Sequence, residues 1–296
     1  MPPDHLNLTA PMLSPGALLM VYCVLVLLAS LAGGWLLLAV HLTHTRLQLA
    51  VSFVAGLMLG IALLHFLPDA NEQLHSLDKT VNWMMGGFLA MFFVQRFFHF
   101  HHHDLPEGDP EDCCGHDHDH DHADHHADHA HTLADKSAKQ LSWVGTVLGL
   151  TLHSLLDGLA LAASVAAGAE GHAKLAGLGV ALVVILHKPF DAMAVSTLMA
   201  AGGSSRFMRH VLNGIFALAS PLGAVLFYVG ASHLAGGNAP VLGCALAFCA
   251  GSFLCIASSD LLPELQFHSH DRFKLSFMLL AGLGVAVLIG MLESGQ

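Results

Sequence analysis

Residues 151–165 read TLHSLLDGLALAASV, and residues 183–197 read VVILHKPFDAMAVST. Each stretch places a histidine four residues before an aspartate within a run of apolar side chains. The two pairs are His153 with Asp157 and His187 with Asp191. Residues four apart share one face of an α-helix. Each histidine lies roughly twelve residues into its run, or about 18 Å along a helix axis. Since a hydrocarbon layer is ~30 Å thick, both stretches predict membrane helices with an ionisable pair at mid-depth.

The chemistry of these four side chains indicates a bound cation. An ionisable group at mid-membrane costs about 2.5–3.5 kcal/mol on insertion scales, so such groups usually line a polar pathway. Imidazole nitrogens and carboxylate oxygens are ligands for divalent metals, and two of each fit tetrahedral zinc, with iron(II), cadmium and manganese left open. The pattern predicts a membrane carrier of divalent metal ions, with the ion as cargo and no resident cofactor.

The composition supports a membrane protein. Of the 296 residues, 54% are hydrophobic and 11% are charged, and the mean hydropathy is +0.62. A soluble domain carries about 25% charged residues. The length allows about eight helices of ~20 residues each. The formal net charge of -11 argues against a nucleic-acid partner, because phosphate binding needs clustered Lys and Arg.

Eight apolar runs give the expected spans, at residues 17–40, 47–67, 81–98, 142–168, 175–200, 207–231, 240–263 and 274–292. Eight Lys and Arg residues then fall on one side of the membrane, and only Lys79 and Lys174 fall on the other. Because cytoplasmic loops are enriched in these residues, both termini are expected outside, and the loop between spans three and four in the cytoplasm. The first run is too long for a signal peptide, and the short loops fit a bacterial inner membrane.

Part of the second run recurs in the seventh. Residues 55–69 read AGLMLGIALLHFLPD and residues 250–264 read AGSFLCIASSDLLPE, with seven of fifteen positions identical. The two runs cross the membrane in opposite directions, which is typical of an inverted repeat in secondary transporters. The expected fold is an all-α integral membrane protein of eight transmembrane helices, with spans 1–3 related to spans 6–8 around central spans 4 and 5.

Residues 99–140 separate the helical segments 1–98 and 141–296. Twelve of the 24 histidines lie within 99–131, many of them alternating with aspartates. Such a segment cannot bury a core, so a disordered cytoplasmic loop is expected. It is either a metal buffer or a solvated spacer whose metal affinity is incidental. The histidines taken to represent its weak metal sites are His116, His118, His120 and His122.

Motifs along nearly the whole chain resemble the ZIP (Zrt/Irt-like protein) family of divalent-metal transporters. In that family, span two carries AG followed by H-x-LP-[DE]-A, matched here at residues 55–70, and span four carries H-[NS]-x-x-[DE]-G, matched at 153–158. Span five carries a related motif, matched at 187–191, and span seven ends in DLLPE, present at 260–264. The resemblance implies a metal site between spans four and five and an elevator-like motion of those spans.

Two departures from the family pattern concern a second metal site. Family members with two adjacent sites usually place an acid or amide directly after the span-five histidine, and a glutamate before Pro-x-Gly in span six. This chain has Lys188 and Ser220 at those positions. The resemblance therefore implies a single metal site, in which the Lys188 ammonium replaces the second cation and offsets part of the charge of Asp157 and Asp191.

The ends of a metal pathway are expected at the two repeated segments. His65 and Asp69 lie at the outward end of span two, and Asp260 and Glu264 lie at the cytoplasmic end of span seven. The alternative for each is an ordinary polar residue at a helix end. Met58 is either a soft sulfur ligand or a packing residue.

Two other functions fit parts of the pattern. A cation-diffusion exporter also pairs acids with histidines, but usually has six spans and a folded C-terminal domain. An integral-membrane His-box metalloenzyme needs clustered His-x-x-His-His boxes near the membrane face, whereas the ordered histidines here lie at mid-depth. The expected protein is therefore not an enzyme, and its partners are divalent metal ions and lipid. The oligomeric state, a homodimer included, stays open.

Overall fold

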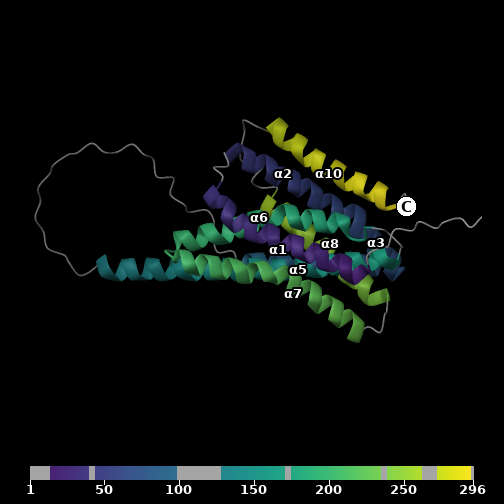
Figure 1. The fold of residues 1–296 in the computed structure, drawn as a ribbon, viewed down its shortest axis with the longest axis horizontal. Coiled ribbons are helices and arrows are strands. Elements are labelled where there is room, and N and C mark those ends of the chain that lie inside the picture. Colours follow the sequence, from purple (N-terminus) through teal and green to yellow (C-terminus); the bar gives the residue numbers. More distant parts are fainter. Residues whose placement is uncertain are drawn as a thin grey trace, which may run out of the picture.

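The computed structural model describes residues 14–39, 44–98, 128–170, 175–234, 239–261 and 272–294, and its regular elements in these ranges are all helices. Figure 1 shows them running roughly along one long direction. Lipid offers no hydrogen-bond partners to the backbone, whereas a helix pairs its own N–H and C=O groups, so the long apolar runs form helices. The expected all-α class is confirmed. In chain order the elements are α1 (Pro15–Ala39), α2 (His44–Ile61), η1 (Ala62–Phe66), α3 (Leu67–Leu74), α4 (Leu77–Phe98), α5 (Asp128–Glu170), α6 (Leu178–Ala201), α7 (Arg206–Leu234), α8 (Ala239–Ile256), η2 (Ala257–Leu261) and α10 (Arg272–Ser294).

Seven helical segments within the described ranges are long and apolar enough to cross a membrane. They are Pro15–Gly34, Thr45–Leu74, Val144–Glu170, Leu178–Ala200, Arg206–Gly230, Pro240–Ser259 and Arg272–Leu292. The expected third span corresponds to α4, a helix of 22 residues. It is not one of the seven because polar residues near both of its ends, such as Asn82, Gln95 and Arg96, lower its hydropathy. A protein with several membrane spans is thus confirmed, with seven candidates where eight were expected.

Helix α5 begins earlier than the composition predicts. It runs for 43 residues from Asp128, so residues 128–140 are helical although they belong to the segment expected to be disordered. Residues 134–141 read ADKSAKQL, and Ala, Lys, Gln and Leu are strong helix formers. Intrinsic propensity therefore extends this helix beyond its apolar run.

The helices fall into two sets according to their contacts. The largest contacts join α2 with α10, α4 with α8 and α3 with α8 in one set, and α5 with α7, α1 with α6 and α1 with α7 in the other. Across the boundary, α5 contacts α8 and α4, and α6 contacts α2. The two helices that carry the His–Asp pairs therefore lie where the two sets meet.

Glycines allow backbones within each set to touch. A β-carbon at any of six glycines would collide with a carbonyl oxygen of the facing helix. Small residues are what lets membrane helices approach this closely, so each set is a tightly packed unit. The glycines form three reciprocal pairs: Gly56 of α2 with Gly282 of α10, Gly87 of α4 with Gly251 of α8, and Gly158 of α5 with Gly223 of α7.

The two repeated segments share a local irregularity. Both η1 and η2 are π-helical turns of five residues, and they occupy equivalent positions in 55–69 and 250–264. Pro68, two residues after η1, has no N–H to donate. Within η1 the Leu67 N–H bonds the Ala62 carbonyl five residues back. The widened turn thus admits a proline while the helix continues into α3.

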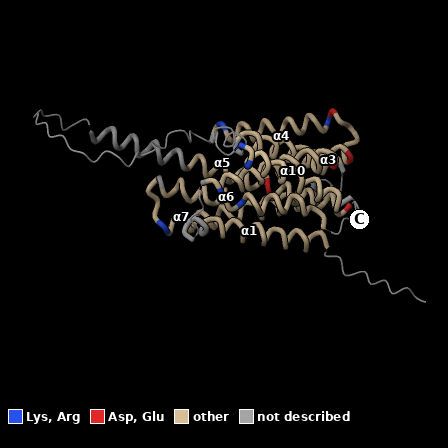
Figure 2. The backbone as a smooth tube through the Cα atoms, turned by 90° about the horizontal axis from the view of Figure 1, so that it is seen from above, with Lys and Arg blue, Asp and Glu red and all other residues tan. Residues whose placement is uncertain are grey.

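Charge is distributed unevenly between the two ends of the molecule. Figure 2 shows Lys and Arg mainly at one end of the helices and most of the Asp and Glu at the other. The basic end holds the N-termini of α2, α7 and α10 and the C-terminus of α4, and its described basic residues are Arg46, Arg96, Arg206, Arg209, Arg272 and Lys274. This asymmetry agrees with the one expected from the sequence.

Candidate metal centre

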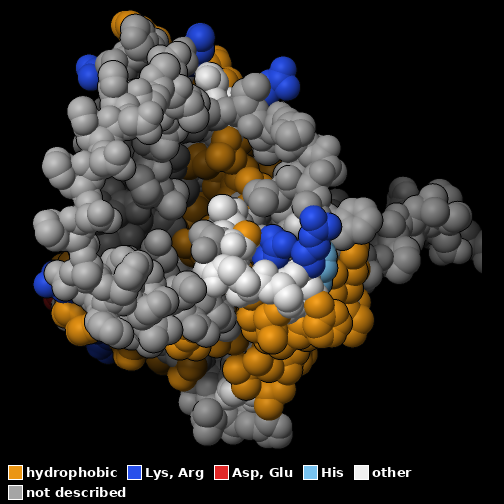
Figure 3. Space-filling view, turned by 90° about the vertical axis from the view of Figure 1, so that its left-hand side faces the viewer, with side chains coloured by type: hydrophobic (Ala, Val, Ile, Leu, Met, Phe, Trp, Pro, Cys, Tyr) orange, Lys and Arg blue, Asp and Glu red, His pale blue; other side chains and the backbone are white. Residues whose placement is uncertain are grey.

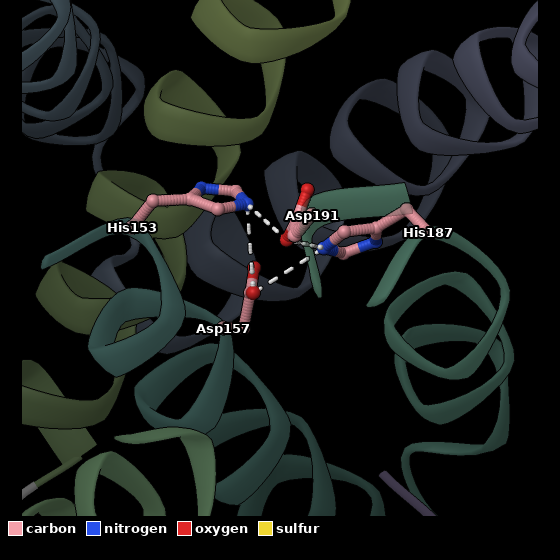
Figure 4. A group of neighbouring side chains, drawn as sticks. All are labelled: His153, Asp157, His187 and Asp191. Carbon is pink, nitrogen blue, oxygen red and sulfur yellow. Dashed lines mark hydrogen bonds and ion pairs between the residues drawn. The ribbon is translucent and has the colours of Figure 1, made fainter. Parts of the chain in front are cut away.

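Four side chains from α5 and α6 converge on one point. Figure 4 shows His153 and Asp157 from α5 directed toward His187 and Asp191 from α6. One nitrogen or carboxylate oxygen of each residue lies within 4.8 Å of those of the others. His153, Asp157 and His187 are buried, and Asp191 is partly buried. Each pair occupies the middle of its helix, so the two helices bring the pairs together at matching depth.

The separations between these atoms suit a small divalent cation. His187 Nε2 lies 3.2 Å from Asp157 Oδ2 and 3.8 Å from Asp191 Oδ2. His153 Nε2 lies 3.5 Å from each of the same two oxygens. Zinc bonds of about 2.0–2.2 Å in a tetrahedron place neighbouring ligand atoms roughly 3.4 Å apart. The four separations between a histidine nitrogen and a carboxylate oxygen are therefore close to those of a tetrahedral zinc shell.

The second nitrogen of each histidine has a different environment. His187 Nδ1 lies 2.9 Å from the Val183 carbonyl, one turn earlier in α6. A neutral ring that donates from Nδ1 presents the lone pair of Nε2 to the cluster, which is how histidine binds metals. His153 Nδ1 is buried and has no hydrogen-bond partner within the described residues. The ring of His187 is therefore held for metal binding by its own helix, whereas that of His153 is not.

A fifth ionisable side chain belongs to the cluster. Lys188 is fully buried, and its ammonium donates hydrogen bonds of 2.7 Å to Asp157 Oδ2 and to Ser154 Oγ. Asp191 Oδ2 lies 3.7 Å from the ammonium, and the centroid of the Phe216 ring lies 5.3 Å from it. A buried ammonium needs such partners, because the cost of removing it from water is several kcal/mol. The cluster thus combines two carboxylates with one built-in cation.

Asp157 uses its two carboxylate oxygens differently. Oδ2 accepts the hydrogen bond from Lys188 and contacts both histidines. Oδ1 is buried and has no hydrogen-bond partner in the part of the chain that the structure describes. Oδ2 is therefore shared between the ammonium and the two histidines, while Oδ1 is a second buried acceptor of the same carboxylate.

Neighbouring helices hold α5 and α6 in position. Gly158, next to Asp157, packs against the Ser220 backbone of α7, and Gly33 of α1 packs against the Pro189 backbone of α6. Pro189 lies inside α6 and frees a carbonyl in the preceding turn, because it has no N–H. At Gly158 the backbones of α5 and α7 therefore approach closely.

Other predicted residues have surroundings of their own. Ser220 is buried, and its hydroxyl has no hydrogen-bond partner among the described residues. Met58 is fully buried in the main apolar core, as a packing residue would be. His65 of η1 is buried, with Nε2 2.9 Å from the Ala286 carbonyl of α10. Asp69 of α3 is partly buried. Neither His65 nor Asp69 belongs to the four-residue cluster.

The remaining predicted residues fall beyond the structural description. Asp260 lies in η2 by its backbone, but its side chain is outside the described part, and Glu264 is outside it entirely. The loop histidines His116, His118, His120 and His122 also lie entirely outside the described residues. Their roles stay predictions.

Two neighbours of the ammonium carried little signal in the sequence. Ser154 follows the first histidine and matches a motif position, but only the structure identifies it as a hydrogen-bond acceptor for Lys188. Phe216 is an aromatic residue in an apolar helix, and nothing in its local sequence distinguishes it from a core residue. Recognising either requires knowing that α5, α6 and α7 meet at this point.

The fold and the site define a membrane protein with a buried cluster of His, Asp and Lys side chains that is consistent with a metal site. Comparison with known proteins identifies its family. The family model for ZIP zinc transporters matches residues 17–290. The chain therefore belongs to the ZIP zinc transporter family, and it is a transporter rather than an enzyme. It is similar to zinc transporter ZIP9-A of Xenopus laevis, with 30% identity over 281 residues that cover 82% of this chain and 85% of the relative.

Proposed function

We propose that this protein moves a divalent metal ion, with zinc as the preferred cargo, into the cytoplasm through His153, Asp157, His187 and Asp191. The observation that carries the proposal is the convergence of their four ligand atoms at the spacing of tetrahedral zinc. The family and the name of the amphibian relative favour zinc. The competing direction, export, is decided by the experiment below.

The site is proposed to hold one metal ion, with Lys188 in the place of a second. The ammonium binds Asp157 Oδ2 at 2.7 Å, as a second cation bridged by this carboxylate would. Two carboxylates and one ammonium give the empty site a charge near -1 when both histidines are neutral. A bound dication brings it to +1. In a site with two metal ions and no lysine, the difference in charge between the empty and the loaded state would be larger.

The proposed topology has eight spans: the seven candidate segments and α4, which is the third span in chain order. Helix α4 packs along α8, and the two backbones approach closely midway along α4, where Gly87 faces the Phe248 backbone and Gly251 faces the Met84 backbone. The basic end (Figure 2) is placed in the cytoplasm by the positive-inside rule, which puts both termini outside and residues 99–127 inside. The proposed membrane is a bacterial inner membrane. The π-helical turns at equivalent positions of 55–69 and 250–264 support an inverted repeat.

The proposed transport step is a movement of one helix set against the other. The reciprocal glycine pairs all join helices of the same set, so each set can move as a unit. The metal ligands lie on α5 and α6, at the boundary between the sets. A displacement there exposes the site to one side of the membrane and then to the other without separating the ligands.

The test is zinc uptake into proteoliposomes by wild type and by His187→Ala and Asp157→Ala. Both variants are expected to lose saturable uptake, because each removes one of four ligands. His210→Ala and Asp78→Ala are matched controls, since both residues are exposed, and they are expected to transport normally. To distinguish import from export, proteoliposomes are prepared with the protein in each of the two orientations. Zinc is supplied either inside the vesicles or in the external buffer, and its movement across the membrane is measured.

Equilibrium zinc binding to the same purified proteins completes the test. Loss of binding together with uptake in the two ligand variants supports the central site. Unchanged uptake in either variant contradicts it. A wild type that moves none of zinc, cadmium and iron(II) in either direction refutes the transport proposal.

A further inference from the structure

The first two turns of α10 and the start of α2 enclose an apolar groove at the basic end of the molecule. Its volume is about 310 Å³, and it is lined by Leu49, Phe273, Lys274, Phe277 and Met278. The Phe273 and Phe277 side chains are 95% and 65% exposed. Apart from the lysine, the walls are hydrocarbon, so the groove suits a flexible apolar chain.

Three cations lie near this groove, on the two helices that form it. Arg46 precedes Leu49 by three residues and therefore shares its side of α2, while Arg272 and Lys274 lie in the first turn of α10. All three are exposed, and neither helix has an acidic residue in its first turn. Basic residues are unfavourable at the positive end of a helix dipole. Beside the groove they leave a positive charge that no acid in either first turn offsets.

Figure 3 looks onto this end of the molecule and shows Lys and Arg side chains at several points around its rim, beside exposed hydrophobic surface. Near an anionic membrane surface, each basic residue contributes favourably to lipid binding, and basic pockets between membrane helices hold anionic headgroups. Cations beside an apolar groove match a molecule with an anionic head and a hydrocarbon tail.

We propose that the groove between α2 and α10 binds one anionic phospholipid of the cytoplasmic leaflet. An acyl chain lies against Leu49, Phe277 and Met278, and the phosphate lies near Arg46, Arg272 and Lys274. The occupant is a lipid rather than free phosphate, because the groove itself offers apolar contacts. The site lies in the set that contains α2 and α10, away from the metal ligands on α5 and α6.

The test uses native mass spectrometry of the full-length protein in detergent with equal amounts of phosphatidylglycerol and phosphatidylcholine of the same acyl chains. Wild type is expected to retain phosphatidylglycerol preferentially. The double variant Arg272→Gln/Lys274→Gln is expected to lower that preference roughly thirty-fold, the scale of two surface cations. Leu49→Trp fills the groove and leaves the charges intact, and it is expected to reduce retention as well.

The control is Arg96→Gln/Arg206→Gln, which removes two exposed cations from the same end but outside the groove. It is expected to behave as wild type. An equal loss in this control, no effect of Leu49→Trp, or full competition by inorganic phosphate would each overturn the lipid site. Thermal unfolding of every variant shows whether a loss comes from misfolding, in which case Leu49→Phe replaces Leu49→Trp. Because the readout is lipid retention without metal, it is independent of the transport proposal.

Discussion

Replacing Lys188 by methionine removes the built-in cation of the metal cluster while keeping an unbranched side chain of similar length. In wild type, the ammonium bonds Asp157 at 2.7 Å and lies 3.7 Å from Asp191. The substitution removes the ammonium from both carboxylates. The variant is expected to bind zinc more tightly, to release it more slowly, and to be less stable when empty.

The distances give the scale of this effect. At an effective dielectric constant of about 20, the attraction between Lys188 and Asp157 is about 6 kcal/mol. A dication among four ligand atoms that lie within 4.8 Å of one another would be roughly 4–5 Å from the ammonium, and the repulsion is about 7 kcal/mol on the same scale. Relaxation and water reduce both figures. We expect zinc affinity to rise at least ten-fold, about 1.4 kcal/mol, and the empty protein to lose about 3–5 kcal/mol from its unpaired carboxylates.

Zinc affinity is measured by competition with a fluorescent chelator on purified protein, and the maximal rate by uptake into proteoliposomes. Thermal unfolding with and without zinc reports the stability of both states, and zinc is expected to stabilise the variant more than wild type. Lys188→Arg keeps the charge, and Lys79→Met removes an exposed lysine elsewhere. Zinc affinity in Lys188→Met that equals or falls below that of wild type would refute the idea that the ammonium occupies a cation position.

Three further outcomes follow from the structure. The double variant Lys188→Asp/Ser220→Glu is expected to bind two zinc ions per chain where wild type binds one, as measured by elemental analysis after dialysis, and one ion in both proteins would contradict the replacement of a second cation. Gly158→Ala is expected to destabilise the protein by about 1–3 kcal/mol through overpacking, since its β-carbon meets the Ser220 backbone. Gly214→Ala, with open space around it, is expected to be neutral or stabilising in the same unfolding assay. Deletion of residues 104–127 is expected to leave the maximal rate of zinc uptake within about two-fold of wild type, because the four proposed ligands lie on α5 and α6. Loss of transport by a folded deletion variant would show that the loop is essential.

The long apolar runs and the paired motifs could be read directly from the sequence. Hydropathy over twenty residues depends only on composition, so the helices of the seven candidate spans were predictable. The i, i+4 spacing placed His153 with Asp157 and His187 with Asp191, and the family motifs indicated that their helices are adjacent. The sequence also predicted that Lys188 would lie beside one of the two aspartates.

Other features depend on information that local sequence lacks. The start of α5 at Asp128 reflects helix propensity in a segment whose composition indicated disorder. The polar residues of α4 lower its hydropathy, although the helix packs fully along α8. The choice of Asp157 as the closer partner of Lys188, and the position of Phe216 beside the ammonium, arise from the crossing of three helices. No pattern within one helix specifies that geometry.

The π-helical turn η1 also determines how α3 is rotated about the axis of the rod, the continuous helical segment that α2, η1 and α3 form. It accommodates one residue more than an α-helical turn, and each residue of an α-helix advances the chain by ~100° about the axis. Helix α3 is therefore turned by about that angle relative to an uninterrupted helix starting at His44. Winding Ala62–Phe66 as a regular α-helical turn, with no residue removed, would swing the Asp69 carboxylate to another side of the rod, whereas deleting one residue at the same time would leave its direction nearly unchanged. The direction of the Asp69 carboxylate thus depends on how many residues the turn η1 contains, and not on any one side chain within it.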